Sequence, residues 1–224
     1  MSNPYENPSN TIHPTAIVSP YATIGKGNKI GAFVVIESNV VLGDNNIISH
    51  HVTIGTAGEV RGENDIKGKV VIGDNNVIRE FTSIQSPQRG DFTQVGNDCF
   101  IMDKTHIAHD NYIGNGVTIA PQTTLGGCVM VGDHSNVGIG VSVRQRLTIG
   151  VGAMIGMGAV ITKDVPHHET WVGVPAKGVG YNLTGLKRRY PNKTEEELLE
   201  ICGVDKSDVY VPPKLSKIIN KYKE

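Results

Sequence analysis

An aliphatic residue recurs every six positions through most of the chain, and a small or β-branched residue precedes many of these positions by two. The pattern runs from Ile12 to Ile54, continues in phase from Ile72 to Ile84, and resumes from Val95 to Ile161 after a shift of one position. A fixed short period is typical of a β-solenoid, in which each repeat buries its apolar side chain by stacking on its neighbours. The sequence therefore predicts an all-β solenoid.

Strand periodicity gives every repeat position a direction. Side chains alternate along a strand, so the aliphatic position, called i, and position i−2 both point into the interior. Positions i+2 and i+3 form a corner, where pairs such as Asp44-Asn45 and Asp133-His134 are typical of turns. We expect three flat faces and about eighteen residues per coil, from three repeats of six. The predicted inward residues at i−2 are Ala16, Ala22, Val34, Val40, Val52, Thr105, Val117, Thr123, Val129, Ala153 and Ala159.

Two segments interrupt the pattern. Thr56 to Lys69 is rich in glycine and charge, and Gln85 to Gln94 contains the shift in phase. We expect both to be loops that project from a rigid scaffold, where binding residues tend to lie.

The pattern fades after Ile161, and a different kind of sequence follows. Thr194 and Glu197 form a capping box that predicts the start of a helix, and Lys214 to Tyr222 reads as a second short helix. We predict a β-helix domain over residues 1–190 and a short helical cap over 191–224 that covers the edge of the last coil.

Composition narrows the environment and the partners. The 224 residues carry a net charge of −1, which gives no electrostatic reason to expect nucleic acid or an anionic membrane as a partner. No apolar run approaches the roughly 18 residues of a membrane helix, and the N-terminus lacks the pattern of a secretory signal. Three cysteines without metal-like spacing favour a reducing compartment. We expect a cytoplasmic protein.

The repeats, followed by Gly173-Val174-Pro175-Ala176, resemble the left-handed parallel β-helix acyltransferases. The runs at 72–80 (IGDNNVIRE), 106–110 (HIAHD) and 182–189 (NLTGLKRR) resemble the UDP-N-acetylglucosamine acyltransferases of lipid A biosynthesis. The resemblance implies a left-handed prism, a homotrimer with active sites in the clefts between subunits, and transfer of an acyl group from acyl carrier protein to a UDP-amino sugar.

His109 falls at a corner and points outward, where a histidine is most often only solvated surface. Acyl transfer to a sugar hydroxyl needs a base, and histidine titrates close to neutral pH. The resemblance implies that His109 is this general base, that Asp110 orients it and favours its protonated form, and that His106 holds the acceptor.

Further site residues follow from the same resemblance. Asn182, Arg188 and Arg189 match residues that bind the nucleotide ribose and diphosphate, and the planar guanidinium of arginine suits a diphosphate. Gln145 matches a glutamine of the acceptor site. Asp65 and Lys67 lie in 64–67, which echoes the acceptor-binding loop of the family at a displaced position.

Met157 matches the position where the family sets acyl-chain length, glycine permitting long chains and a bulkier residue blocking the groove. At about 0.8 kcal/mol per buried methylene, a groove shorter by a few carbons selects the donor. The resemblance then implies a short to medium, 3-hydroxyacyl-type chain. Simple packing of the methionine between coils is the alternative.

Several positions depart from the family. Gln85, Cys128 and Arg144 stand where the family has histidines, and Thr184 stands where it has an acidic residue. Gly173 to Ala176 is also typical of coenzyme A-dependent acetyltransferases of this fold. The donor is therefore either acyl carrier protein, through its 4′-phosphopantetheine, or an acyl-coenzyme A. The second reading is an acetyltransferase that modifies a nucleotide-linked sugar for surface polysaccharide.

Two other functions use the same scaffold. A zinc hydrase needs three converging histidines, but the positions eighteen after His106 and His109 are Thr124 and Gly127. We therefore expect no metal site and no bound cofactor. A non-catalytic interaction protein is the remaining alternative.

Overall fold

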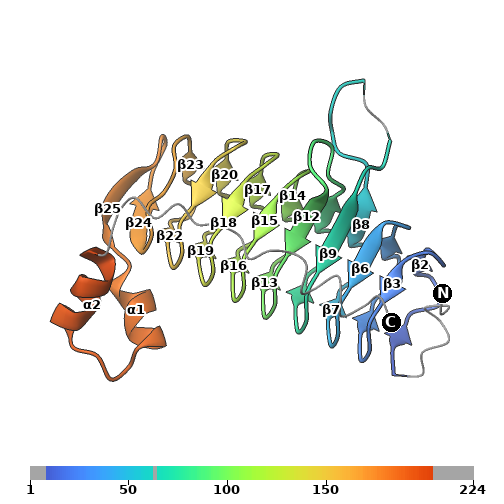
Figure 1. The fold of residues 1–224 in the computed structure, drawn as a ribbon, viewed down its shortest axis with the longest axis horizontal. Helices are drawn as coiled ribbons and strands as arrows, with labels where there is room; N and C mark the ends of the chain where they lie inside the picture. Colours follow the sequence, from blue (N-terminus) through green and yellow to red (C-terminus); the bar gives the residue numbers. More distant parts are fainter. Residues whose placement is uncertain (1–8, 63–64, 204–224) are drawn as a thin grey trace.

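The computed structural model describes residues 9–62 and 65–203. Short strands wind into an elongated three-sided prism, with a long loop projecting from one edge and two helices at the C-terminal end (Figure 1). Up to Ile161, strands three places apart along the chain pair in parallel, so three sheets run along the prism. The fold is the predicted left-handed parallel β-helix.

The three sheets are named A, B and C in the order in which the chain first enters them. Sheet A contains β1 (Thr11–Ile12), β4 (Lys29–Ile30), β7 (Ile47–Ile48), β10 (Val77–Ile78), β13 (Phe100–Ile101), β16 (Thr118–Ile119), β19 (Asn136–Val137), β22 (Met154–Ile155), β24 (Glu169–Val172) and β25 (Lys177–Tyr181). Sheet B contains β2 (Ile17–Val18), β5 (Val35–Ile36), β8 (Thr53–Thr56), β11 (Ser83–Gln85), β14 (His106–Ile107), β17 (Thr124–Leu125), β20 (Ser142–Val143) and β23 (Val160–Ile161). Sheet C contains β3 (Thr23–Ile24), β6 (Val40–Leu42), β9 (Lys69–Ile72), β12 (Phe92–Val95), β15 (Tyr112–Ile113), β18 (Met130–Val131) and β21 (Thr148–Ile149). The corners between them are the A–B, B–C and C–A edges.

Both predicted interruptions leave the prism at the B–C edge. Corner residues in adjacent coils are normally 18 apart in sequence, but the separation rises to 30 between Asp44 and Asp74 and to 23 between Asp74 and Asn97. The extra residues form a long loop (57–68) between β8 and β9 and a short loop (86–91) between β11 and β12. Ile84 still pairs with Ile54 and Val95 with Ile72, and the register shifts by one residue only at Gln85, which pairs with Thr56. The excursions therefore leave the aliphatic rows of the core aligned.

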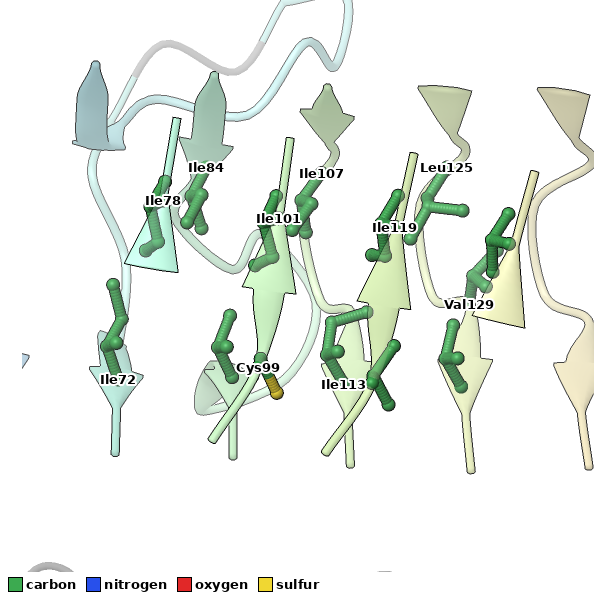
Figure 2. Packing of buried hydrophobic residues seen from close by; sticks show 14 of the residues in the cluster. Ile72, Ile78, Ile84, Cys99, Ile101, Ile107, Ile113, Ile119, Leu125 and Val129 are labelled. Carbon is green, nitrogen blue, oxygen red and sulfur yellow. The ribbon is translucent and has the colours of Figure 1, made fainter. Parts of the chain in front are cut away.

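The interior consists of rows of aliphatic side chains, one row for each repeat position. Figure 2 shows Ile84, Ile107 and Leu125 following one another in successive coils, and their strands pair in that register. All three are fully buried. Full burial of one such side chain is worth about 1.5–3 kcal/mol, so the stacked coils supply most of the stability.

The prediction for position i−2 is confirmed where it names small and β-branched residues, all of which are buried. It is incomplete at the N-terminal end, because Asn28, Asn46 and Asn76 occupy the same position and are also buried. Each side-chain oxygen accepts from the backbone N–H of the equivalent residue one coil on, at 2.8–2.9 Å, and each amide donates to a glycine carbonyl at 2.9 Å. The ladder satisfies these polar groups, so burying them carries little penalty.

The corners adopt a left-handed backbone conformation at position i+3. Thirteen non-glycine residues among those described have φ between 54° and 61°, and all occupy this position. An L-residue there costs roughly 1–2 kcal/mol. Compensation comes from neighbouring coils: the N–H of Gln122, for example, donates to the carbonyl of Asp103 at 3.0 Å.

The C-terminal segment closes the prism. β24 and β25 form an antiparallel hairpin that extends sheet A, with 173–176 as its turn. α1 (Leu183–Arg189) and α2 (Glu195–Gly203) pack on each other through Leu186, Leu198 and Cys202. The border predicted between residues 190 and 191 thus lies between two helices that share one small cluster.

The capping box at the start of α2 is confirmed. The N–H of Thr194 donates to Glu197 Oε2 at 2.7 Å, and the N–H of Glu197 donates to Thr194 Oγ1 at 3.3 Å. The second predicted helix, Lys214 to Tyr222, lies outside the described residues. Within the described ranges, no helix is long and apolar enough to cross a membrane.

The left-handed corners predict a matched pair of stability effects at Gln122, an exposed residue with φ of 60°. Gln122→Val places a β-branched residue in this conformation and should lower the free energy of unfolding by about 1–2 kcal/mol. Gln122→Gly removes the steric strain and should unfold at the wild-type denaturant concentration or above it. Equal midpoints for the two variants in urea titrations would contradict this account of the corners.

Candidate active site

His109 and Asp110 form a close pair at the B–C edge, on the corner that follows β14. His109 Nδ1 and Asp110 Oδ2 are 2.7 Å apart, and both side chains are mostly buried. Because an ionised carboxylate only accepts hydrogen bonds, the pairing places the proton on Nδ1 and leaves the Nε2 lone pair as the acceptor. The pair has the arrangement of a base and its orienting acid.

The short loop holds the Asp110 carboxylate in place. The backbone N–H groups of Gln88, Arg89 and Gly90 donate to it at 3.1, 3.1 and 2.7 Å. Burial alone would raise the pKa of Asp110, but these N–H groups and the His109 ring outweigh it and the pKa is lowered. The carboxylate therefore stays ionised at neutral pH and keeps His109 oriented.

Gly127, at the same corner one coil further on, makes room for the His109 ring. A Cβ atom on Gly127 would lie 2.4 Å from His109 Cε1 and 2.5 Å from Nε2. Any other residue at this position would displace the ring, so Gly127 is part of the geometry of the pair.

His106 lies on β14, three residues before His109, and its ring links the strand to the long loop. Its Nδ1 is 2.7 Å from Ser83 Oγ, and its Nε2 is 3.9 Å from Glu59 Oε2. Burial lowers the pKa of His106, and Glu59 opposes this shift. The imidazole is therefore mostly neutral at neutral pH, as expected of a hydrogen-bonding residue.

Three more predicted residues lie at the B–C edge. Gln145 is exposed and occupies the corner two coils after His109, about 10 Å along the prism at the usual spacing of adjacent strands. Asp65 and Lys67 are exposed on the long loop, and the Asp65 carbonyl accepts from Gln88 Nε2 at 3.0 Å. The two loops are thus joined next to the His109 pair.

The predicted nucleotide-binding residues lie at a different edge. Asn182 is the N-cap of α1, where its Oδ1 accepts from the N–H of Gly185 at 3.0 Å, and its Nδ2 donates to the carbonyl of Gly152 at 3.0 Å. Arg188 and Arg189 follow on the same helix and line a pocket of about 300 Å³ at the C–A edge. Sheet C separates this pocket from His109 within one chain.

Met157 lies at the third edge, A–B, after β22. Its side chain is 77% exposed, so packing between coils of its own chain does not explain it. Ile139, at the same corner one coil earlier, is 50% exposed. Together they form a small apolar strip along this edge.

Comparison with known proteins agrees with the fold. Residues 21–56 and 92–127 match the model of the bacterial transferase hexapeptide family (six repeats). The chain is similar to the UDP-N-acetylglucosamine acyltransferase of Francisella novicida, with 31% identity over 96% of this chain and 83% of that one and a TM-score of 0.64. The chain belongs to the UDP-N-acetylglucosamine acyltransferase family.

Two more members of this family illustrate the range of the similarity. The Bacteroides fragilis enzyme is 27% identical over 95% of this chain and 90% of its own, with a TM-score of 0.76. The Arabidopsis enzyme is 29% identical over 94% of this chain and 88% of its own, with a TM-score of 0.68. No curated protein matches the sequence. Because the chain belongs to the UDP-N-acetylglucosamine acyltransferase family, it is an acyltransferase on the hexapeptide-repeat fold, as predicted.

The positions that depart from the family have different surroundings in this acyltransferase. Gln85 is buried, and its Oε1 accepts from the N–H of Glu59 at 3.4 Å. Arg144 and Thr184 are exposed. Burial raises the pKa of Cys128, and Asp110 raises it further, so its thiol is protonated at neutral pH.

Cys128 also belongs to a cluster that sequence reasoning did not identify. His109, Asp110 and Cys128 are the one set of potential metal-binding residues in the described parts of the chain, with ligand atoms within 4.8 Å of one another. Since the carboxylate already accepts three backbone N–H groups and the His109 ring, its oxygens are poorly placed to bind an ion as well.

The sequence also did not predict the roles of Ser83, Glu59, Gly127 or the short-loop N–H groups. Each depends on the contact between one coil and the next. The signal that was available is the spacing of eighteen, which places Gly127 directly after His109 at the B–C edge.

The packing of His109 on Gly127 predicts a selective loss of activity. Gly127→Ala should push the ring away from Asp110 and reduce acyltransferase kcat by at least tenfold, with little change in the denaturation midpoint. Gly203→Ala is the control, because a Cβ there meets no atom of the described residues within 4 Å. A Gly127→Ala enzyme within twofold of wild-type kcat would show that the ring does not depend on this glycine.

Proposed function

We propose that this enzyme transfers a short to medium 3-hydroxyacyl-type group from acyl carrier protein to a hydroxyl or amine of a UDP-amino sugar such as UDP-N-acetylglucosamine, as in lipid A biosynthesis. The observation that carries the proposal is the His109–Asp110 pair, held by three backbone N–H groups at the edge of the prism. The similar proteins of Francisella novicida and Bacteroides fragilis are UDP-N-acetylglucosamine acyltransferases, which supports this acceptor.

In the proposed reaction, His109 Nε2 takes the proton of the acceptor hydroxyl while the oxygen attacks the thioester carbonyl. The new ester bond forms as the carbon–sulfur bond breaks, and the proton passes from Nε2 to the leaving thiolate. Asp110 holds the ring through Nδ1 and stabilises the imidazolium between the two steps. His106, Gln145, Asp65 and Lys67, all at the same edge, are proposed to bind the acceptor.

Asn182, Arg188 and Arg189 are proposed to bind the ribose and diphosphate of the nucleotide. The position of their pocket at the C–A edge, with sheet C between it and His109, supports a site shared between neighbouring subunits. We therefore propose a homotrimer in which one subunit supplies His109 and another supplies the arginines. The trimer and the cytoplasmic location stay predictions.

The exposed strip of Met157 and Ile139 at the A–B edge supports a role in measuring the acyl chain. Much of this apolar surface is left uncovered by the described residues, and such a surface suits a hydrocarbon held between subunits. We propose that the Met157 side chain closes the far end of that groove.

The test offers the enzyme UDP-N-acetylglucosamine or its 3-amino analogue, with acyl carrier proteins of several chain lengths and separately with acetyl-coenzyme A, and weighs the products. His109→Ala should reduce kcat by about 10²–10⁴-fold, the usual contribution of a general base. His51→Ala, at an exposed corner of the A–B edge, is the control.

Activity of His109→Ala within threefold of wild type would remove His109 from the mechanism. Transfer from acetyl-coenzyme A alone would overturn the proposed donor and favour the acetyltransferase alternative. A monomer in sedimentation would contradict the shared site.

The proposed role of Met157 in limiting acyl-chain length predicts a change in donor selectivity. Met157→Gly should shift the ratio of kcat/KM toward acyl chains longer by a few carbons, by at least tenfold, because each methylene admitted to the groove contributes about 0.8 kcal/mol. Val172→Gly, at an exposed position on the neighbouring strand β24, is the control. An unchanged chain-length profile in Met157→Gly would refute the proposed role of Met157 in limiting acyl-chain length.

A further inference from the structure

The C–A edge carries an alternation of glycine and histidine that the proposed reaction does not use. Gly116, His134, Gly152 and His168 occupy the same corner position in successive coils, with φ of 62°, 59°, 64° and 59°. The N–H of His134 donates to the carbonyl of Asn115 at 2.7 Å, and the other three corners bond to the preceding coil as well. These backbone hydrogen bonds therefore fix the position of the histidine backbone from which each imidazole extends.

Each glycine leaves the space that the next imidazole occupies. A Cβ atom on Gly116 would lie 2.5 Å from His134 Nδ1, and one on Gly152 would lie 2.5 Å from His168 Nδ1. Both rings thus lie along the edge and line the pocket that Asn182, Arg188 and Arg189 line. The pocket has two imidazoles in addition to its two guanidinium groups.

Arg189 lies next to both histidines. Its Nη2 is 3.5 Å from the carbonyl oxygen of His134, and its Nη1 is 3.6 Å from the Cβ position on Gly152, where the His168 ring packs. The described part of the chain offers no hydrogen-bond partner to the buried Nδ1 of His168.

Burial, together with the local charges, favours the neutral form of both imidazoles at neutral pH. Burial lowers the pKa of His134, Arg189 lowers it further, and Asp133 opposes the shift. Burial lowers the pKa of His168 to about 4, and Arg189 and His167 add to this. A second positive charge beside Arg189 is thus unfavourable until a negative charge enters the pocket.

We propose that His134 and His168 are further binding residues of this pocket and that they take up protons when a nucleoside diphosphate group enters it. The inference rests on the proposed function, which assigns the nucleotide to Arg188 and Arg189. A diphosphate diester brings negative charge and acceptor oxygens beside the rings, which favours the imidazolium forms.

The sign of the pH dependence follows from this linkage. Each pKa is lowered in the free protein and should be higher in the complex, so binding takes up protons at pH values between the free and the bound pKa. Affinity should therefore rise as the pH falls through that interval, by up to about tenfold per pH unit for each proton taken up.

The test is calorimetric titration of UDP-N-acetylglucosamine, whose diphosphate diester does not itself titrate in this range, into the full-length enzyme between pH 8 and pH 5.5. Buffers of different ionisation enthalpy report the protons taken up. We expect wild-type affinity to rise at least tenfold over this range with net proton uptake. His134→Gln and His168→Gln should each flatten the profile, and the double variant should take up no protons.

His51→Gln is the matched control, since His51 occupies the same left-handed corner position at the A–B edge, with φ of 60°. It should behave as wild type. A wild-type profile in the double variant, or flat affinity and no proton uptake in the wild type, would overturn the inference.

Arg188→Ala separates this failure from failure of the proposed function. Suppose that wild type binds UDP-N-acetylglucosamine with an affinity that does not change with pH, and that Arg188→Ala weakens this binding. In that case only the proposed role of the histidines is wrong. If wild type shows no binding at any pH, both the proposed acceptor and the inference are wrong.

Discussion

Hydrogen bonding between the backbones of successive coils is the constraint on which the rest of the structure depends. Each strand is only a few residues long and has no stability of its own, so every coil is defined by its pairing with the coils on both sides. The in-register pairing aligns Ile84, Ile107 and Leu125 into one apolar row and sets Gly127 against His109. Core and candidate site are consequences of the same ladder.

This dependence explains what the sequence could and could not predict. The period of six gave the sheets, the inward positions and the corners, because a side chain's direction follows from its place in the repeat. The capping box at Thr194 was equally predictable, since it involves residues three apart. The proposed role of His109 as the base came from a resemblance, and its position at an outward corner agreed with the pattern.

The features that could not be predicted from the sequence depend on contacts between coils. The asparagine ladder escaped prediction because a buried asparagine is acceptable only when the coils on both sides supply its partners. The N–H groups that hold Asp110 come from a loop whose length breaks the period, so counting by eighteen does not find them. Met157 was left open between packing and selection, and its exposure decided against packing within the chain.

The candidate residues are distributed over all three edges of the prism. His109, Arg189 and Met157 each lie at a separate edge, so one chain holds the parts of the proposed site without assembling them. No single edge carries all three residues, and apposed edges of neighbouring copies provide the simplest way to bring them together. The arrangement makes the proposed chemistry depend on association.

Both loops interrupt the same edge, while the buried aliphatic residues beside them stay paired from coil to coil. The B–C edge therefore tolerates loops of different length and sequence without repacking of the interior. The surface at this edge can vary while the repeat positions that define the fold stay the same. A change in the length of either loop can therefore alter the surroundings of His109 while the interior of the prism stays the same.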